Sequence, residues 1–465
     1  MRDLLLSTAE RAANFLESAE QRSVAAVADR VELLHRLATP LPELPEPAGE
    51  VLARFAQDIE PGLVASGSSR YFGFVLSGAT PISIAADWLT SAWDQNAFVY
   101  ATSPAAAIVE EIVADWVTEL FHLPKCSSVG FVTGGQMANF TALSAARNAV
   151  LGKAGWDLES EGLFGAPPIA VFMSESAHAT VRSALRMMGI GNRSIHAIPA
   201  DQQGRMQPEL LEPAMANHKG PAIVSLQAGN VNTGAFEPFS RIADIAERHN
   251  AWIHVDGAFG LWAAVSPRLQ HLVEGMERAD SWTVDAHKWL NVPHDSGLVI
   301  VKDPAWHRSL KTARCAYAGP VCENHRDGSA WSPENSRRAR AFVLYAVLRS
   351  LGRTGIQAMI ERSCKMARMF AERASDLPHA HILNDVSLNQ VLLRFAPPNV
   401  TDLDHFHEAV AQAVQRQGRC WLGTTLWSGE TVLRLSFSNW QTGPNAVQEA
   451  VDGLAEAVAH LTKTN

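Results

Sequence analysis

The chain has 465 residues, which is long enough to bury a large hydrophobic core and to divide into two or three domains. Its formal net charge of -9 provides no basic field for nucleic acid or for an anionic membrane, so we expect neither as a partner. A composition of 47% hydrophobic and 19% charged residues is ordinary for a water-soluble protein, and a small molecule is the expected ligand.

The cysteines and the apolar stretches predict a cytoplasmic location. The five cysteines are an odd number without C-x-x-C spacing, which argues against a disulfide framework and against a zinc or other metal site. They are Cys126, Cys315, Cys322, Cys364 and Cys420. The longest uncharged stretch, Cys126–Ala146, approaches the ~20 residues of a bilayer span, but polar residues interrupt it, so we expect no membrane segment.

Residues 1–60 predict an N-terminal helical arm and not a signal peptide, because an acidic residue comes early and the apolar run is short. We expect two helices joined by the proline-rich link 40–47, which cannot be helical throughout. Apolar residues recur at helical spacing in the first of them: Leu4, Leu5, Ala9, Ala12 and Leu16. Such an arm has little core of its own, so we expect it to pack on a partner subunit or on the next domain.

An aromatic block follows the arm, with Tyr71-Phe-Gly-Phe74, Trp88, Trp93 and the polar run 94–98. It is equally consistent with a domain core and with the wall of a substrate pocket. Both interpretations stay open at this point.

Residues 129–304 alternate between apolar runs and helix-like segments. Helix-like segments begin near Met137, His178 and Pro238. The apolar runs are 169–173, 222–226, 252–255 and 297–301. This alternation predicts an α/β fold whose mainly parallel sheet is covered on both faces. Ligands in such sheets bind at the carboxyl ends of the strands, where Asp256 would lie.

Lys288 stands between a histidine and a tryptophan in the segment 281–291. A lone lysine is usually a solvated surface charge. Here, however, Asp256 follows a predicted strand, and a glycine-rich turn at residues 133–139 opens a helix. A pyridoxal phosphate site needs an amine for the aldehyde, a carboxylate for the pyridine nitrogen and a phosphate cradle. The three features together predict such a site, with Lys288 as the Schiff-base lysine.

The glycine turn is the candidate phosphate cradle, because amides at a helix N-terminus bind a dianion well. Its amides are those of Gly135, Gln136 and Met137. His178 lies at the end of a strand, where a histidine is most often structural. In a cofactor pocket the same ring can stack on the pyridine ring and orient a substrate carboxylate.

The C-terminal third predicts a smaller α+β domain, so we expect three parts. They are the arm at 1–60, a large cofactor-binding domain at 61–354 and the small domain at 355–465. Residues 311–333 are rich in small and polar side chains without periodicity, which is typical of a functional or disordered loop, and we expect a mobile one.

Several motifs occur in one order along the chain. They are Phe72-Gly-Phe74, Ala101-Thr-Ser-Pro-Ala105, the glycine turn, Ser176-Ala-His178, His254-Val-Asp-Gly-Ala258, His287-Lys-Trp289, Ser336-Arg-Arg-Ala339 and Leu388-Asn-Gln-Val391. In these motifs nearly the whole chain resembles the group II pyridoxal phosphate decarboxylases of aromatic amino acids, histidine and glutamate. That family has the aspartate aminotransferase fold and forms its sites at a subunit interface, so the resemblance and the arm together imply a homodimer.

The resemblance also implies roles for single residues. Lys288 would carry the cofactor, Asp256 would pair with the pyridine nitrogen, and His178 would stack on the ring with Ala258 against its other face. His287 would lie by the phosphate with the glycine-turn amides.

Three positions depart from the family pattern. Asn230 stands where a threonine is common, and its amide can still donate a hydrogen bond to the cofactor. Asp285 stands where an asparagine often helps to hold the phosphate. An acid repels a dianion, so we expect Asp285 to face another group. In the animal aromatic amino acid decarboxylases, the loop that matches residues 311–333 carries a tyrosine that acts at the site. This chain has no counterpart of it, because Tyr317 comes too early and Trp331 is the nearest aromatic residue.

The expected reaction is therefore decarboxylation of an L-amino acid, apolar or aromatic in view of the aromatic block, to an amine and carbon dioxide. The alternatives within enzymes are an aldehyde synthase, an aldol-type lyase and an aminotransferase. A homologue that binds a partner without catalysis is the alternative outside enzymes, and the presence of both Lys288 and Asp256 argues against it.

Overall fold

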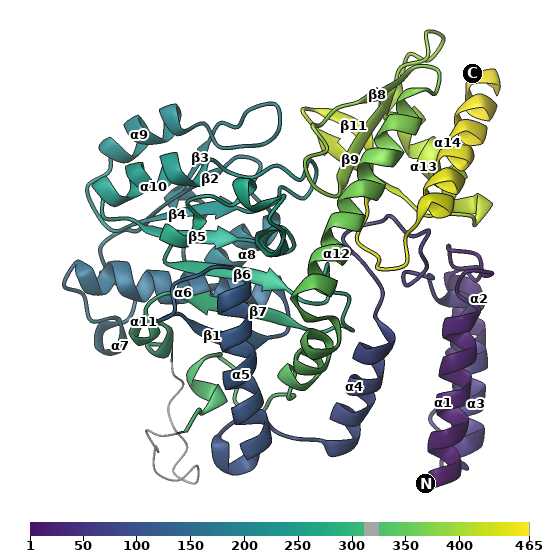
Figure 1. Ribbon diagram of the computed structural model, residues 1–465, viewed down its shortest axis with the longest axis horizontal. Coiled ribbons are helices and arrows are strands. Elements are labelled where there is room, and N and C mark those ends of the chain that lie inside the picture. Colours follow the sequence, from purple (N-terminus) through teal and green to yellow (C-terminus); the bar gives the residue numbers. More distant parts are fainter. Residues whose placement is uncertain (311–324, 465) are drawn as a thin grey trace. The chain divides into compact units, whose positions relative to one another are not determined.

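The computed structural model describes residues 1–310 and 325–464 and divides into two compact units. The larger unit comprises Ala79–Lys365 and Asn384–Gln390. The smaller unit comprises Met1–Gly78, Met366–Leu383 and Val391–Asn465. Figure 1 labels their helices and strands.

The larger unit is built on a seven-stranded sheet with the order β1-β7-β6-β5-β4-β2-β3. Its strands are β1 (Ser128–Val132), β2 (Ala170–Ser174), β3 (Ile195–Ile198), β4 (Ala222–Gln227), β5 (Trp252–Asp256), β6 (Ser281–Asp285) and β7 (Gly297–Val301). Strands β3, β2, β4, β5 and β6 pair in parallel, whereas β7 runs antiparallel to both β6 and β1. The mainly parallel sheet expected from the apolar runs is confirmed.

Helices cover both faces of this sheet, since every residue of β1, β2, β4, β5, β6 and β7 is buried. Helix α6 (Gly135–Lys153) packs along β5, β6 and β7, and α10 (Phe239–Arg248) packs on β5. The other helices of the unit are α4 (Pro81–Trp93), α5 (Pro104–Leu120), α7 (Leu158–Glu161), α8 (Ala179–Met187), α9 (Pro208–Ala216), α11 (Pro304–Arg308) and the first part of α12 (Ala341–Ser375).

Two local signals set helix boundaries here. The Ser103 side chain accepts a hydrogen bond from the Ala106 amide at 3.2 Å and Pro104 occupies the first turn, and both features favour the start of α5 at this point. Gly352 has φ 60° and interrupts α12, which therefore consists of two helices that meet there.

The smaller unit combines an N-terminal arm with a four-stranded sheet in the order β10-β11-β9-β8. The arm has three helices, so the prediction of two was wrong: the Asp29 side chain accepts from the Glu32 amide and starts an extra helix ahead of the proline-rich link. The arm helices are α1 (Arg2–Glu17), α2 (Arg30–Leu37) and α3 (Ala48–Ile59). The remaining elements are β8 (Ala380–Ile382), β9 (Gln390–Phe395), β10 (Gly423–Trp427), β11 (Glu430–Ser436), α13 (Leu403–Gln417), α14 (Pro444–Thr464) and the second part of α12. Along the described chain, no helix is long and apolar enough to cross a bilayer.

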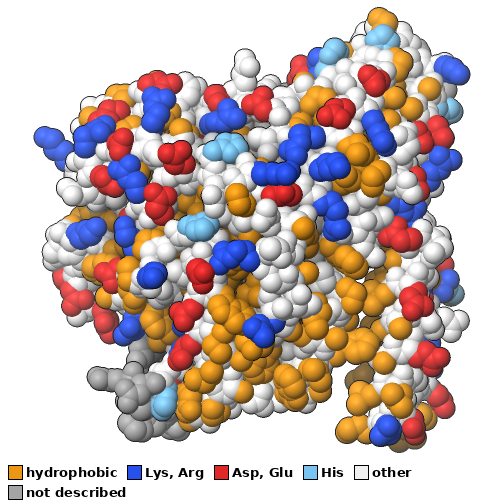
Figure 2. Space-filling model, viewed as in Figure 1, with side chains coloured by type: hydrophobic (Ala, Val, Ile, Leu, Met, Phe, Trp, Pro, Cys, Tyr) orange, Lys and Arg blue, Asp and Glu red, His pale blue; other side chains and the backbone are white. Residues whose placement is uncertain are grey.

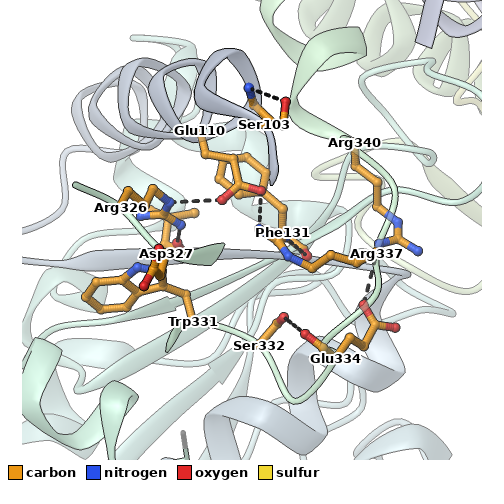
Figure 3. A network of polar contacts seen from close by, with 12 residues as sticks. Ser103, Glu110, Phe131, Arg326, Asp327, Trp331, Ser332, Glu334, Arg337 and Arg340 are labelled. Atoms are coloured by element: carbon orange, nitrogen blue, oxygen red, sulfur yellow. Dashed lines mark hydrogen bonds and ion pairs between the residues drawn. The ribbon is translucent and has the colours of Figure 1, made fainter. Parts of the chain in front are cut away.

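A buried ion cluster holds the described part of the irregular segment in place (Figure 3). Arg326 Nε donates to Glu110 Oε2 at 2.9 Å, and Arg337 Nη2 donates to the other oxygen of the same carboxylate. Arg337 also donates to the Phe131 carbonyl at 3.2 Å. The side chains of Glu110 and Arg337 are each 1% exposed. Residues 325–333 are irregular apart from one short 3-10 turn, while 311–324, including Tyr317, lie outside the described residues.

Glu110 is therefore expected to be critical for stability. The Glu110→Gln variant removes the carboxylate that both buried guanidinium groups contact, and we expect the free energy of unfolding to fall by about 3–5 kcal/mol. Urea unfolding followed by circular dichroism measures this loss. Glu119→Gln on the same helix is the control, because the Glu119 side chain is 73% exposed and its ion pair with Arg353 is expected to contribute under about 1 kcal/mol. Equal losses in both variants would contradict the interpretation of the cluster.

Candidate active site

Polar residues gather where three neighbouring parallel strands end. Gln227 ends β4, Asp256 ends β5 and Asp285 ends β6, so adjacent strands bring the three side chains to one edge of the sheet. All three line one pocket. Its other lining residues are Gly135, Gln136, Asn139, His178, Thr180, Gly229, Val231, Ala258, Phe259 and Lys288.

Asp256 is only 5% exposed and accepts hydrogen bonds at both carboxylate oxygens. Its Oδ1 accepts from the Ala258 amide at 3.2 Å, and its Oδ2 accepts from Asn139 Nδ2 at 3.0 Å. Both donors are neutral groups. They stabilise the ionised carboxylate and leave its charge free for a cationic ligand group in the pocket.

Lys288 reaches the same pocket from the connection between β6 and β7. Its Nζ lies 2.8 Å from Asp285 Oδ2. Asp285 thus faces the amine of Lys288. His287 Nε2 lies 3.7 Å from the other Asp285 oxygen. The Ser296 amide donates to His287 Nδ1, and burial lowers the pKa of the His287 imidazole.

The glycine turn lies against this pair of side chains. A Cβ added to Gly134 would come within 2.8 Å of His287 Cε1, and one added to Gly135 within 2.8 Å of Asp285 Oδ2. A side chain at either position would collide with His287 or Asp285, so the close approach of the turn requires glycine. Gly135 and Gln136 also line the pocket, and a helix N-terminus beside a lysine and a buried carboxylate fits a phosphorylated aldehyde cofactor.

The remaining predicted site residues fall into two groups. His178 lines the pocket at the N-terminus of α8, where Nδ1 accepts from the Thr180 amide at 3.3 Å and lies 2.7 Å from Thr180 Oγ1. Ala258 and Gln136 line it too. The Met137 side chain instead packs on the hydrophobic core, and Asn230 accepts from backbone amides of its own loop.

Sequence reasoning missed several lining residues, above all Asn139 and Thr180. Asn139 follows Gly135 by four residues and so lies on the same side of α6, which is a signal that helical spacing carries. Thr180 comes two residues after His178, at the start of α8. Gln227 gave only the weaker signal of a polar residue at the end of an apolar run.

Comparisons with known proteins agree with this geometry. The model of the pyridoxal-dependent decarboxylase conserved domain matches residues 32–396. L-2,4-diaminobutyrate decarboxylase of Rhizobium meliloti is 29% identical, over 91% of this chain and 84% of that protein. Phenylacetaldehyde synthase of Petunia hybrida is 26% identical, over 85% of this chain and 81% of that protein. The crystal structure of Oryza sativa TDC with PLP and tryptamine superposes with a TM-score of 0.92 at 23% identity, covering 99% of this chain and 98% of that one.

Proposed function

The chain belongs to the pyridoxal-dependent decarboxylase family, and from this membership we propose how its own residues remove the carboxyl group of an amino acid. It is a pyridoxal phosphate-dependent carboxy-lyase. The cofactor, when bound, supplies an aldehyde that reacts with amines and a pyridine ring that accepts the electrons of the broken bond. The observation that carries the assignment of roles is that Lys288 and Asp256 line one pocket beside the glycine turn.

Lys288 is the amine that would bind the aldehyde. Asp256 would pair with the pyridine nitrogen and keep a proton on it, because a buried carboxylate stabilises an adjacent cation strongly. His178 would stack on the bound cofactor and orient the substrate carboxylate, and Ala258 would contact the cofactor from the opposite side.

The amides of Gly135, Gln136 and Met137 at the start of α6 would hold the phosphate, with His287 beside it. Asn230 is proposed as a further contact near the cofactor, although its side chain is already engaged in its own loop. The division into an arm at 1–60, a cofactor-binding domain at 61–354 and a small domain at 355–465 is kept as a proposal. Most of the predicted loop 311–333 lies outside the described residues.

The proposed substrate is an apolar or aromatic L-amino acid. The charged residues lining the described pocket are Asp256, Asp285 and Lys288, and each has a role that does not involve a substrate side chain. An acidic side chain would need an additional cation in that lining. Phe259 and Val231 supply apolar surface instead.

A panel of L-amino acids tests the reaction and its substrate together. We expect the enzyme loaded with pyridoxal phosphate to release carbon dioxide and an equal amount of amine from phenylalanine, tyrosine or tryptophan at least tenfold faster than from glutamate. Aldehyde with hydrogen peroxide in place of amine would favour an aldehyde synthase, the activity that names the Petunia relative. Carbonyl products without carbon dioxide would favour an aminotransferase or an aldol-type lyase.

The role of Lys288 has its own test. Borohydride reduction of the loaded enzyme is expected to fix the cofactor on the Lys288 peptide, as read by mass spectrometry, and Lys288→Ala is expected to lose both this label and turnover. Lys302→Ala is the control, because Lys302 follows β7 at the opposite edge of the sheet. A label on another lysine would contradict the assignment.

We also propose that the chain forms a homodimer. No residue of α1, α2 or α3 is buried, although apolar side chains line these helices. In the larger unit, Figure 2 shows a hydrophobic patch over α4, α5 and the start of α12. A groove of about 550 Å³ in this patch is lined by Ala86, Leu89, Trp93, Gln95, Ala105, Val109, Phe342, Tyr345 and Ala346. Patches of this kind are typical of subunit interfaces.

Leu89→Asp is expected to convert the dimer to a monomer, because it places a charge in the apolar groove. Light scattering on the purified enzyme measures the change, with twice the mass of one chain expected before the substitution. Leu210→Asp on α9 is the control, with a side chain that is similarly exposed (40%, against 50% for Leu89). A fully active wild-type monomer would overturn the proposal.

The proposed location is the cytoplasm. Among the described residues, Cys126, Cys364 and Cys420 form no disulfide, and disulfides are typical of oxidising compartments.

A further inference from the structure

Asn139 connects the two side chains proposed to act on the cofactor ring. It is 1% exposed and lies on α6, facing the pocket. Its Nδ2 donates to Asp256 Oδ2 at 3.0 Å and to Thr180 Oγ1 at 3.4 Å. Thr180 Oγ1 in turn lies 2.7 Å from His178 Nδ1. One amide group therefore contacts Asp256 directly and His178 through a single hydroxyl.

The carbonyl side of the same amide is also fully used. Thr283 Oγ1 donates to Asn139 Oδ1 at 3.0 Å, and His254 Nε2 lies 2.9 Å from that oxygen. An asparagine side chain has two N–H donors and two acceptor sites, so all four are engaged. The four contacts come from three elements that meet α6 at this residue: β5 supplies Asp256 and His254, β6 supplies Thr283 and α8 supplies Thr180.

The hydrogens along this chain have one consistent arrangement. Asn139 Oδ1 carries no hydrogen, so the proton of the His254 ring lies on Nε2. His254 Nδ1 then accepts from Ser281 Oγ at 3.0 Å, and this hydroxyl accepts from Trp252 Nε1 at 2.9 Å. Burial lowers the pKa of His254 to about 4, so the ring is neutral and has a single proton to donate. Each group in this series donates its hydrogen to the next one, from Trp252 through Ser281, His254 and Asn139 to the Asp256 carboxylate.

We propose that Asn139 is a positioning residue for the decarboxylation, oriented by His254 and Thr283 so that its amide N–H groups hold Asp256 ionised and aligned with the pyridine nitrogen. This inference rests on the proposed role of Asp256. A reversed amide would occupy the same volume but would point its oxygen at the carboxylate and its N–H groups at Thr283 and His254. The contacts behind Asn139 select the orientation that stabilises the charge.

The test measures the pyridine nitrogen itself. Enzyme loaded with pyridoxal phosphate labelled with 15N in the ring reports protonation of this nitrogen by its NMR shift. In Asn139→Asp, which keeps the shape of the side chain, two carboxylates stand about 3 Å apart and must share a proton, so Asp256 loses part of its charge. We expect the 15N resonance to move toward the unprotonated position and kcat to fall at least tenfold, with KM changed less than twofold.

Thr283→Val is the second variant, because it removes one donor to Asn139 Oδ1 at nearly constant volume. We expect the same direction of 15N shift and at least a threefold loss in kcat. Ser144→Ala is the matched control. Ser144 is a buried residue on α6 whose hydroxyl donates to Met188 Sδ at 2.9 Å, which is not a member of the Asn139 network. The 15N resonance of the cofactor and kcat in this variant are expected to equal those of the wild type. Thermal unfolding of each variant shows whether a loss of activity reflects a loss of fold. If Asn139→Asp does not fold, the 15N shift and kcat of Thr283→Val test the inference.

Asp256→Asn separates failure of this inference from failure of the proposed function. If Asp256→Asn shifts the 15N resonance while Asn139→Asp and Thr283→Val leave it and kcat at wild-type values, Asn139 is a packing residue only, and the proposed function stands. If Asp256→Asn also leaves the resonance unchanged, the role of Asp256 is wrong and the inference falls with it.

Discussion

The site depends on a carboxylate that has to remain ionised at the end of a buried strand. Removing a charge from water is unfavourable unless hydrogen-bond donors replace the lost hydration. For Asp256 these donors come from the turn after its own strand and from α6, so the packing of α6 on β5 is also an electrostatic requirement. The parallel pairing of β4, β5 and β6 brings the remaining polar residues to the same edge.

The chain stabilises the buried carboxylates of Glu110 and Asp256 in different ways. Glu110 is bound by the guanidinium groups of Arg326 and Arg337, which leaves no negative charge for a ligand and ties the residues before α12 to the sheet. Asp256 is surrounded by neutral donors. A cationic side chain paired with Asp256 would compensate the charge of this carboxylate, and the proposed interaction with the protonated pyridine nitrogen would be weaker. The difference in neighbours therefore separates a structural carboxylate from a functional one.

The sequence predicted those parts that local patterns specify. Apolar runs located β2, β4, β5 and β7, and the rule that ligands bind at strand ends placed Asp256 correctly at the end of β5. Strand β6 was missed because Ser281 and Thr283 alternate with apolar residues, although all of its positions are buried. These two hydroxyls bond to His254 and Asn139, partners that lie 27 and 144 residues away along the chain. Such pairings depend on the register of the folded sheet, and no local pattern reveals them.

The same distinction between neighbours applies within the pocket, which holds two carboxylates and one lysine. Asp285 stands beside Lys288 Nζ at 2.8 Å with His287 on its other side, whereas the described hydrogen bonds to Asp256 come from the Ala258 amide and Asn139 Nδ2, which are both neutral. An ammonium group has no lone pair, so Nζ has to give up a proton before it can bond to an aldehyde carbon, and Asp285 is an acceptor within reach. An acid at position 285 therefore suits the nitrogen that it contacts better than it suits a phosphate. In the proposed assignment, the carboxylate at the end of β5 serves the ring nitrogen and the carboxylate at the end of β6 serves the lysine. This separation follows from the strand that each carboxylate ends.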